Sequence, residues 1–138
     1  MKHVLVVEDD PMNAKLFQML LSRKGPYEVS ISDQADEVLD RVRSGTIDLV
    51  IMDVSLKDAT YDGQAIDGVG ITRLIKDDER TRIVPVLLAT AHAMQGDREA
   101  LLANSGAEDY VSKPITDHQQ FLSKVGALIA KRPPGPNG

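Results

Sequence analysis

Residues 4–9 are Val-Leu-Val-Val-Glu-Asp, and residues 49–53 are Leu-Val-Ile-Met-Asp. Each stretch is a short apolar run that ends in acidic residues, a pattern that predicts a buried strand of a parallel sheet. Two later apolar runs end in Thr90 and in Lys113. The carboxyl ends of neighbouring parallel strands converge on the crevice where open α/β sheets bind ligands. We therefore expect one site that contains Glu8, Asp9, Asp53, Thr90 and Lys113.

Length and composition limit the class of protein. The chain has 138 residues, of which 42% are hydrophobic and 4% aromatic, so it can bury one mainly aliphatic core. It has no Cys, which excludes disulfides, thiolate metal sites and a cysteine nucleophile. The apolar stretch after His3 is too short for a signal peptide or a membrane span, so we expect a cytoplasmic protein without membrane insertion. The net charge of −5 argues against direct binding of nucleic acid.

Short apolar runs alternate with amphipathic stretches, which predicts repeated βα units around a parallel sheet. The first helix should begin at Pro11 with Asp10 as its cap, and the last should begin with the capping-box pattern of residues 116–119. Residues 1–131 are expected to form one domain, followed by a disordered tail over residues 132–138. The predicted strands lie near residues 3–8, 27–32, 47–52, 84–89 and 108–111, and the predicted helices cover residues 11–24, 33–44, 68–78, 93–105 and the segment from residue 116 onward.

Three converging carboxylates need a counter-charge. Two unit charges about 4 Å apart repel by roughly 4 kcal/mol at an effective dielectric near 20, so the set favours a bound divalent cation. Mg²⁺ prefers oxygen ligands and often combines one or two carboxylates with a phosphate oxygen. A hydroxyl and an ammonium beside such a metal suit phosphoryl transfer, with one carboxylate as the nucleophile and an aspartyl phosphate as the product.

Four segments together resemble the receiver domain of two-component response regulators. They are Val7-Glu8-Asp9-Asp10, Met52-Asp53-Val54-Ser55-Leu56, Ala89-Thr90-Ala91 and Ser112-Lys113-Pro114. The resemblance covers roughly residues 2–131 and implies a single doubly wound, flavodoxin-like (βα)5 domain. Its five parallel strands would have the order 2-1-3-4-5, with helices on both faces. Residues 90–97 are most similar to stand-alone receivers of the cell-cycle regulator kind.

The resemblance also implies roles for the acidic residues. Asp53 matches the phosphoacceptor, and Asp9 matches the direct ligand of Mg²⁺ or Mn²⁺. Glu8 matches an auxiliary carboxylate that acts through metal-bound water. Ser55 matches the position whose backbone carbonyl completes the metal shell. Asp10 has no such role, and its capping preference makes it a helix cap.

Other positions match the residues that respond to phosphorylation. Thr90 matches the hydroxyl that moves toward the phosphoryl group, and Lys113 matches the ammonium that pairs with it. Pro114 matches a cis proline. Tyr110 matches an aromatic switch, although a partly buried packing residue is the plainer interpretation. His92, together with Ser55, is a hypothetical determinant of phosphoryl lifetime, and an ordinary exposed loop residue is the alternative.

The implied function is a phosphorelay signalling switch that is not an enzyme beyond self-catalysed phosphotransfer and dephosphorylation. Its implied partners are a sensor histidine kinase or a histidine phosphotransfer protein, and a downstream protein target. The surface of the fourth helix, last strand and last helix would carry the change in docking and could also form a dimer.

One departure from the family lies in residues 54–67, where the loop after the phosphoacceptor is longer than usual and has Lys57 in place of a proline. The insertion could be neutral, since loop closure costs grow only slowly with length. It could instead place Tyr61 and Ile66 over the site or against a partner.

Two other functions remain open at this stage. A receiver-fold binding module that is never phosphorylated would share the fold, but the full set of site residues argues against it. An aspartyl-nucleophile phosphatase of the haloacid-dehalogenase type would need a second Asp two places after the nucleophile. Ser55 occupies that place.

Overall fold

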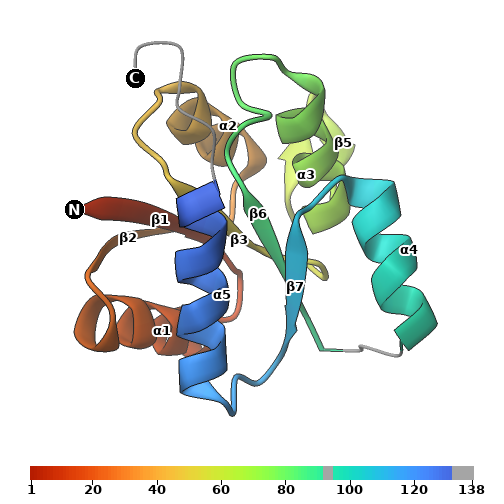
Figure 1. Ribbon diagram of the computed structural model, residues 1–138. Helices are drawn as coiled ribbons and strands as arrows, with labels where there is room; N and C mark the ends of the chain where they lie inside the picture. The colour runs from red at the N-terminus through yellow and green to blue at the C-terminus, as the bar shows by residue number, and fades with distance from the viewer. Residues whose placement is uncertain (92–94, 132–138) are drawn as a thin grey trace.

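The computed structural model describes residues 1–91 and 95–131 of the chain. One parallel sheet has the strand order β2-β1-β3-β6-β7 (Figure 1), which is the predicted order once a small hairpin is left out of the numbering. The predicted doubly wound fold is thereby confirmed. The strands are β1 (Lys2–Val7), β2 (Tyr27–Ser32), β3 (Leu49–Asp53), β6 (Val86–Thr90) and β7 (Asp109–Ser112).

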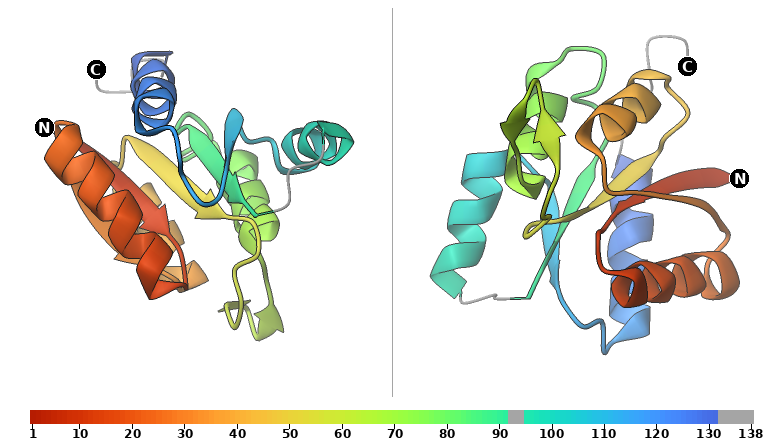
Figure 2. Two further views of the ribbon diagram at one scale, coloured as in Figure 1. Left: turned by 90° about the horizontal axis from the view of Figure 1, so that it is seen from below. Right: turned by 180° about the vertical axis from the view of Figure 1, so that it is seen from behind.

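Helices cover both faces of the sheet, because the central strands are apolar on both sides. Val4 and Val6 of β1 pack with the α1 and α5 side of the core, whereas Leu5 and Val7 pack with the α2 and α3 side. Seen from behind in Figure 2, α2 and α3 lie in front of the sheet and α5 lies beyond it. The helices are α1 (Pro11–Met19), continued by a π-helical turn (Leu20–Lys24), α2 (Ala35–Arg43), α3 (Gly68–Asp77), α4 (Gln95–Ser105) and α5 (His118–Lys131).

The first residues of α1 and α5 show whether the two predicted helix caps, Asp10 and Thr116, are correct. The Asp10 carboxylate accepts a hydrogen bond from the Met12 N–H at 3.0 Å, which confirms Asp10 as the cap of α1. The capping-box prediction at Thr116 is wrong by one residue. The Asp117 carboxylate accepts from the Gln120 N–H at 2.9 Å, because it reaches the third amide of a helix that begins at His118.

The long loop after β3 contains an element that the sequence analysis did not predict. Residues Thr60–Tyr61 (β4) and Gln64–Ala65 (β5) pair as an antiparallel hairpin. Its tip residues Asp62 and Gly63 have φ of 54° and 78°, the positive values that a tight two-residue hairpin turn requires. Tyr61 and Ile66 pack against the α2 and α3 side of the core. The insertion therefore adds to the hydrophobic core.

Two predictions cannot be placed in this structure. His92 and the tail over residues 132–138 lie outside the described residues. Within residues 1–91 and 95–131, no helix has the length and apolar character needed to cross a membrane.

The start of α3 lies directly against the end of β3. A Cβ atom at Gly68 would stand 1.9 Å from the carbonyl oxygen of Asp53, closer than any real contact allows. Only glycine fits there without a backbone shift, so the sequence at residue 68 fixes how closely α3 approaches the site.

We expect Gly68→Ala to lower the free energy of unfolding by about 1–3 kcal/mol, because the added methyl group forces the backbone apart. Urea denaturation measures this. Gly126→Ala is the matched control, since its Cβ would meet only the Tyr27 hydroxyl at 3.7 Å. Gly126 lies in the interior of α5, so replacing it with Ala should raise the free energy of unfolding by about 0.4–1 kcal/mol. Equal stability of Gly68→Ala and the unsubstituted protein would contradict the close approach.

Candidate functional site

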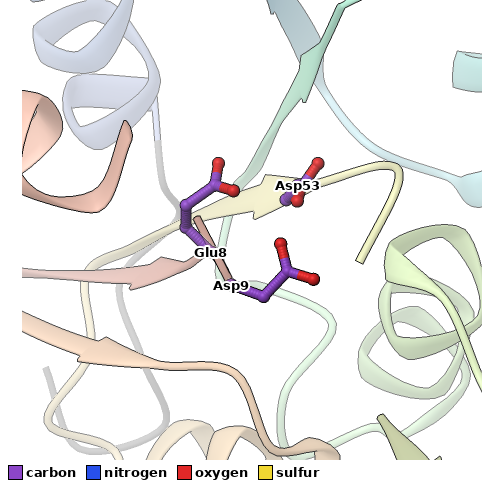
Figure 3. A group of neighbouring side chains, drawn as sticks. All are labelled: Glu8, Asp9 and Asp53. Atoms are coloured by element: carbon purple, nitrogen blue, oxygen red, sulfur yellow. The ribbon is translucent and has the colours of Figure 1, made fainter. Parts of the chain in front are cut away.

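Three carboxylates meet at the carboxyl ends of β1 and β3. One oxygen from each of Glu8, Asp9 and Asp53 lies within 4.8 Å of the others (Figure 3). Glu8 is 4% exposed and Asp53 is 2% exposed, whereas Asp9 is only partly buried. The structure thus brings together the three acidic residues that the sequence predicted at one site.

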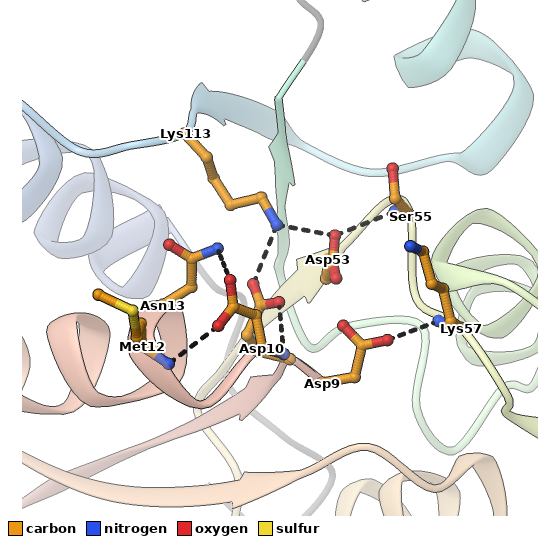
Figure 4. Close-up of polar contacts among 9 residues, drawn as sticks. Asp9, Asp10, Met12, Asn13, Asp53, Ser55, Lys57 and Lys113 are labelled. Carbon is orange, nitrogen blue, oxygen red and sulfur yellow. Dashed lines mark hydrogen bonds and ion pairs between the residues drawn. The ribbon is translucent and has the colours of Figure 1, made fainter.

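Lys113 supplies the positive charge beside these carboxylates. Its Nζ lies 3.0 Å from Asp53 Oδ1 and 3.1 Å from Glu8 Oε2 (Figure 4). Its backbone N–H donates to the Thr90 carbonyl at 2.8 Å, which ties the end of β7 to the end of β6. The Lys113–Pro114 peptide bond is cis, the isomer that the family resemblance implies.

Burial and charge shift the acidity of two site residues. Desolvation by burial, reinforced by the neighbouring Asp53 carboxylate, raises the pKa of Glu8 from 4.5 to about 7, although the Lys113 ammonium acts in the opposite direction. Burial alone would lower the pKa of Lys113, but its hydrogen bonds to Asp53 and Glu8 outweigh that effect and raise it. Near neutral pH, Glu8 is therefore partly protonated while Lys113 stays charged.

Backbone N–H groups orient all three carboxylates. The Asp10 N–H donates to Glu8 Oε1 at 3.2 Å, and the Ser55 N–H donates to Asp53 Oδ1 at 3.0 Å. The Lys57 N–H donates to Asp9 Oδ2 at 2.8 Å across 48 positions of the chain. This contact was not predictable from the sequence, because any residue except proline offers a backbone N–H donor.

Thr90 and Ser55 lie where the sequence analysis expected them. Thr90 is buried at the end of β6, next to β3 on one side and to Ser112 of β7 on the other. Ser55 is exposed, two residues beyond Asp53. The Ser55 N–H contacts Asp53 directly, and Thr90 ends the strand that lies between β3 and β7.

Tyr110, in the middle of β7, has two cations beside its ring. The Arg98 guanidinium stands 5.0 Å from the ring centroid and donates to the Tyr110 hydroxyl at 3.1 Å. The Lys124 ammonium stands 4.9 Å from the same centroid and donates to the Tyr110 carbonyl at 2.9 Å. Neither Arg98 nor Lys124 stands out in the sequence, because isolated surface cations are common in helices.

The chemistry of the donor set fits a hard divalent cation. Carboxylate oxygens are the ligands that Mg²⁺ prefers, and the site offers three of them beside a single ammonium. The three carboxylates, when ionised, carry more negative charge than Lys113 balances. The arrangement can therefore bind a cation and present an oriented carboxylate as a nucleophile.

Comparisons with known proteins agree with this geometry. The family model described as "Response regulator receiver domain" matches residues 4–125. The polar-differentiation response regulator DivK of Brucella ovis is 39% identical over 115 residues, which span 83% of this chain and 86% of that protein.

Solved receiver structures have the same fold. The receiver domain of sensor histidine kinase PA1611 from Pseudomonas aeruginosa, solved with a magnesium ion in its active-site cleft, is 28% identical with a TM-score of 0.78, over 94% of this chain and 98% of that one. A receiver domain of a histidine kinase from Syntrophus aciditrophicus is 26% identical with a TM-score of 0.78, over 97% and 96% of the two chains.

The family match over most of the chain and the DivK relatives confirm the predicted resemblance: this chain belongs to the response regulator receiver domains of two-component systems, a regulatory family that switches with phosphorylation.

Proposed function

We propose that Asp53 accepts a phosphoryl group from the phosphohistidine of a histidine kinase or a histidine phosphotransfer protein. The observation that carries this proposal is the placement of the Asp53 carboxylate. It is buried at a strand end, held by the Ser55 N–H and the Lys113 ammonium, and flanked by two further carboxylates. Asp9 is less buried, and Glu8 has a raised pKa that makes it a poorer nucleophile near neutral pH.

The transfer is a substitution at phosphorus. A carboxylate oxygen of Asp53 forms the new P–O bond while the P–N bond of the donor breaks, and the leaving imidazole takes the bonding electrons and then a proton from solvent. Lys113 stays charged, and its ammonium donates a hydrogen bond to a phosphoryl oxygen, which stabilises the negative charge that develops there. The Thr90 hydroxyl is the group that moves toward the phosphoryl oxygens.

Mg²⁺ or Mn²⁺ fits the proposed site. Three carboxylate oxygens lie within 4.8 Å of one another, and hard divalent cations prefer oxygen ligands of this kind. We assign Asp9 and Asp53 as direct ligands, the Ser55 carbonyl as a third ligand, and Glu8 as a partner through bound water. When bound, the metal would neutralise charge on the phosphoryl oxygens.

Phosphorylation of Asp53 would change the surface of the protein through a movement of the Tyr110 side chain. The ring lines a cavity of about 230 Å³ between α4, β7 and α5, which Arg98, Phe121 and Lys124 also line. An inward turn of Tyr110 toward Thr90 would break its hydrogen bond to Arg98 and reshape this surface. A downstream protein target, or a second copy of the chain in a dimer, would then bind the two conformations of this surface with different affinities.

We expect the protein to gain one phosphoryl group when incubated with Mg²⁺ and acetyl phosphate, as measured by intact mass. Asp53→Asn should abolish the gain, because an amide oxygen is a far weaker nucleophile than a carboxylate. Asp10→Asn is the matched control. Asn also caps helices well, so this control should keep both the fold and the phosphorylation.

Phosphorylation of Asp53→Asn to the level of the unsubstituted protein would contradict the assignment of Asp53. No gain by the unsubstituted protein, either from acetyl phosphate or from a phosphorylated histidine kinase, would favour the alternative of a binding module that is never phosphorylated.

The raised pKa of Glu8 predicts a pH-dependent stability of the metal-free protein. The folded chain holds this proton more tightly than the unfolded chain, so Glu8 favours folding below about pH 4.5, and this contribution is lost as the pH rises through about 7. Glu8→Gln resembles the protonated form at every pH. In EDTA, its melting temperature should match that of the unsubstituted protein near pH 4.5 and exceed it near pH 8.

Saturating Mg²⁺ should reduce the advantage of Glu8→Gln at pH 8, because the cation offsets the charge of the ionised carboxylate. If Glu8→Gln instead becomes progressively less stable than the unsubstituted protein as the pH rises, the ionised Glu8 is stabilising and the electrostatic account of the site is wrong.

A further inference from the structure

A groove of about 400 Å³ lies at the base of the β4–β5 hairpin, outside the carboxylate site. Its two walls come from residues 56–59, which precede the hairpin, and from residues 65–67, which begin with the last residue of β5. The residues that line it are Leu56, Asp58, Ala59, Ala65, Ile66 and Asp67.

The apolar part of the groove is firmly packed. Leu56 and Ala59 are 5% and 1% exposed and belong to the α2 and α3 side of the core. Ile66 packs against the same core and is so close to Gly70 that a Cβ there would stand 2.7 Å from it. The Ile66 N–H also donates to the Ala59 carbonyl at 3.0 Å, which joins the two walls.

The charged part of the groove is acidic. Asp58 and Asp67 are both exposed and both line it, and no Lys or Arg does. Across the described part of the chain, neither carboxylate forms an ion pair with a Lys, Arg or His side chain. Asp67 Oδ1 accepts from the Gly70 N–H as the cap of α3. The lining therefore carries two carboxylates that form no ion pair among the described residues.

Both walls are connected to the carboxylate site. Lys57, between Leu56 and Asp58, donates its N–H to Asp9. Gly68, directly after Asp67, lies against the carbonyl of Asp53. A protein that binds the face around Asp53 would therefore pass close to this groove.

We propose that the groove receives a lysine or arginine side chain of a partner protein that docks on this face. Such a side chain lays its apolar stem along a hydrophobic surface and keeps its charged end beside water and carboxylates. Ile66 and the exposed Ala65, which lie over the buried Leu56 and Ala59, suit the stem, and Asp58 and Asp67 suit the charge. The acidic lining disfavours nucleic acids and anionic membranes, so charge complementarity points to a basic segment of a protein.

The test is an amide NMR titration with acetyl-Gly-Arg-Gly-amide and with the same peptide containing citrulline, the neutral isostere of arginine. Unphosphorylated protein without Mg²⁺ is used, so the result does not depend on the proposed phosphoryl transfer. We expect the arginine peptide to shift the amide signals of residues 56–59 and 65–68, and the citrulline peptide to leave them in place.

Two Asp→Asn variants supply the matched comparison. Asp58 and Asp62 have φ of 58° and 54°, a conformation that Asn adopts readily, but only Asp58 lines the groove. Asp58→Asn should weaken binding of the arginine peptide about two- to fivefold, the range that one exposed ion pair supports. Asp62→Asn should leave the affinity unchanged.

The proposal is overturned if both peptides shift the same signals, if neither shifts signals of the groove, or if the two variants weaken binding equally. The last result would mean that the arginine peptide senses only the general negative charge of the chain.

Discussion

The mutual repulsion of three carboxylates is the constraint on which the site depends. Glu8, Asp9 and Asp53 share the end of two adjacent strands, and two of them are almost fully buried. Lys113 offsets part of this charge, but the strand order places β6 between β3 and β7. The Lys113 side chain must therefore extend across the end of β6 to contact Asp53 and Glu8. Its backbone hydrogen bond to Thr90 fixes the position from which the side chain extends. Burial, reinforced by the neighbouring Asp53 carboxylate, raises the pKa of Glu8. The negative charge that Lys113 leaves unbalanced suits a divalent cation.

The same constraint explains the structure of the loops that follow the strands. Backbone N–H groups of Asp10, Ser55 and Lys57 each donate to one of the carboxylates. These hydrogen bonds fix the conformation of the loops around the site. The hairpin follows Lys57, and its core contacts lie on the α2 and α3 side of the sheet. The insertion therefore adds surface beside the site.

The sequence predicted those parts of the structure that depend on local pattern. Continuous apolar runs that end in Glu8, Asp53, Thr90 and Lys113 determined both the sheet and the residues at its edge, and Asp10-Pro11 marked a helix start. The hairpin was missed because strands of two residues show no alternation, although Asp62-Gly63 is a strong turn signal. The contacts of Arg98 and Lys124 with Tyr110 were not predictable, because they depend on how α4 and α5 pack beside β7.

A crystal structure of the protein with Mg²⁺ and beryllofluoride, which mimics a phosphoryl group, would locate the acceptor and the metal together. We expect beryllium bonded to a carboxylate oxygen of Asp53, and Mg²⁺ bound by Asp9 and Asp53 with the Lys113 ammonium beside the fluorides. Beryllofluoride on Glu8 or Asp9, or a metal ion that does not contact Asp9, would contradict these assignments.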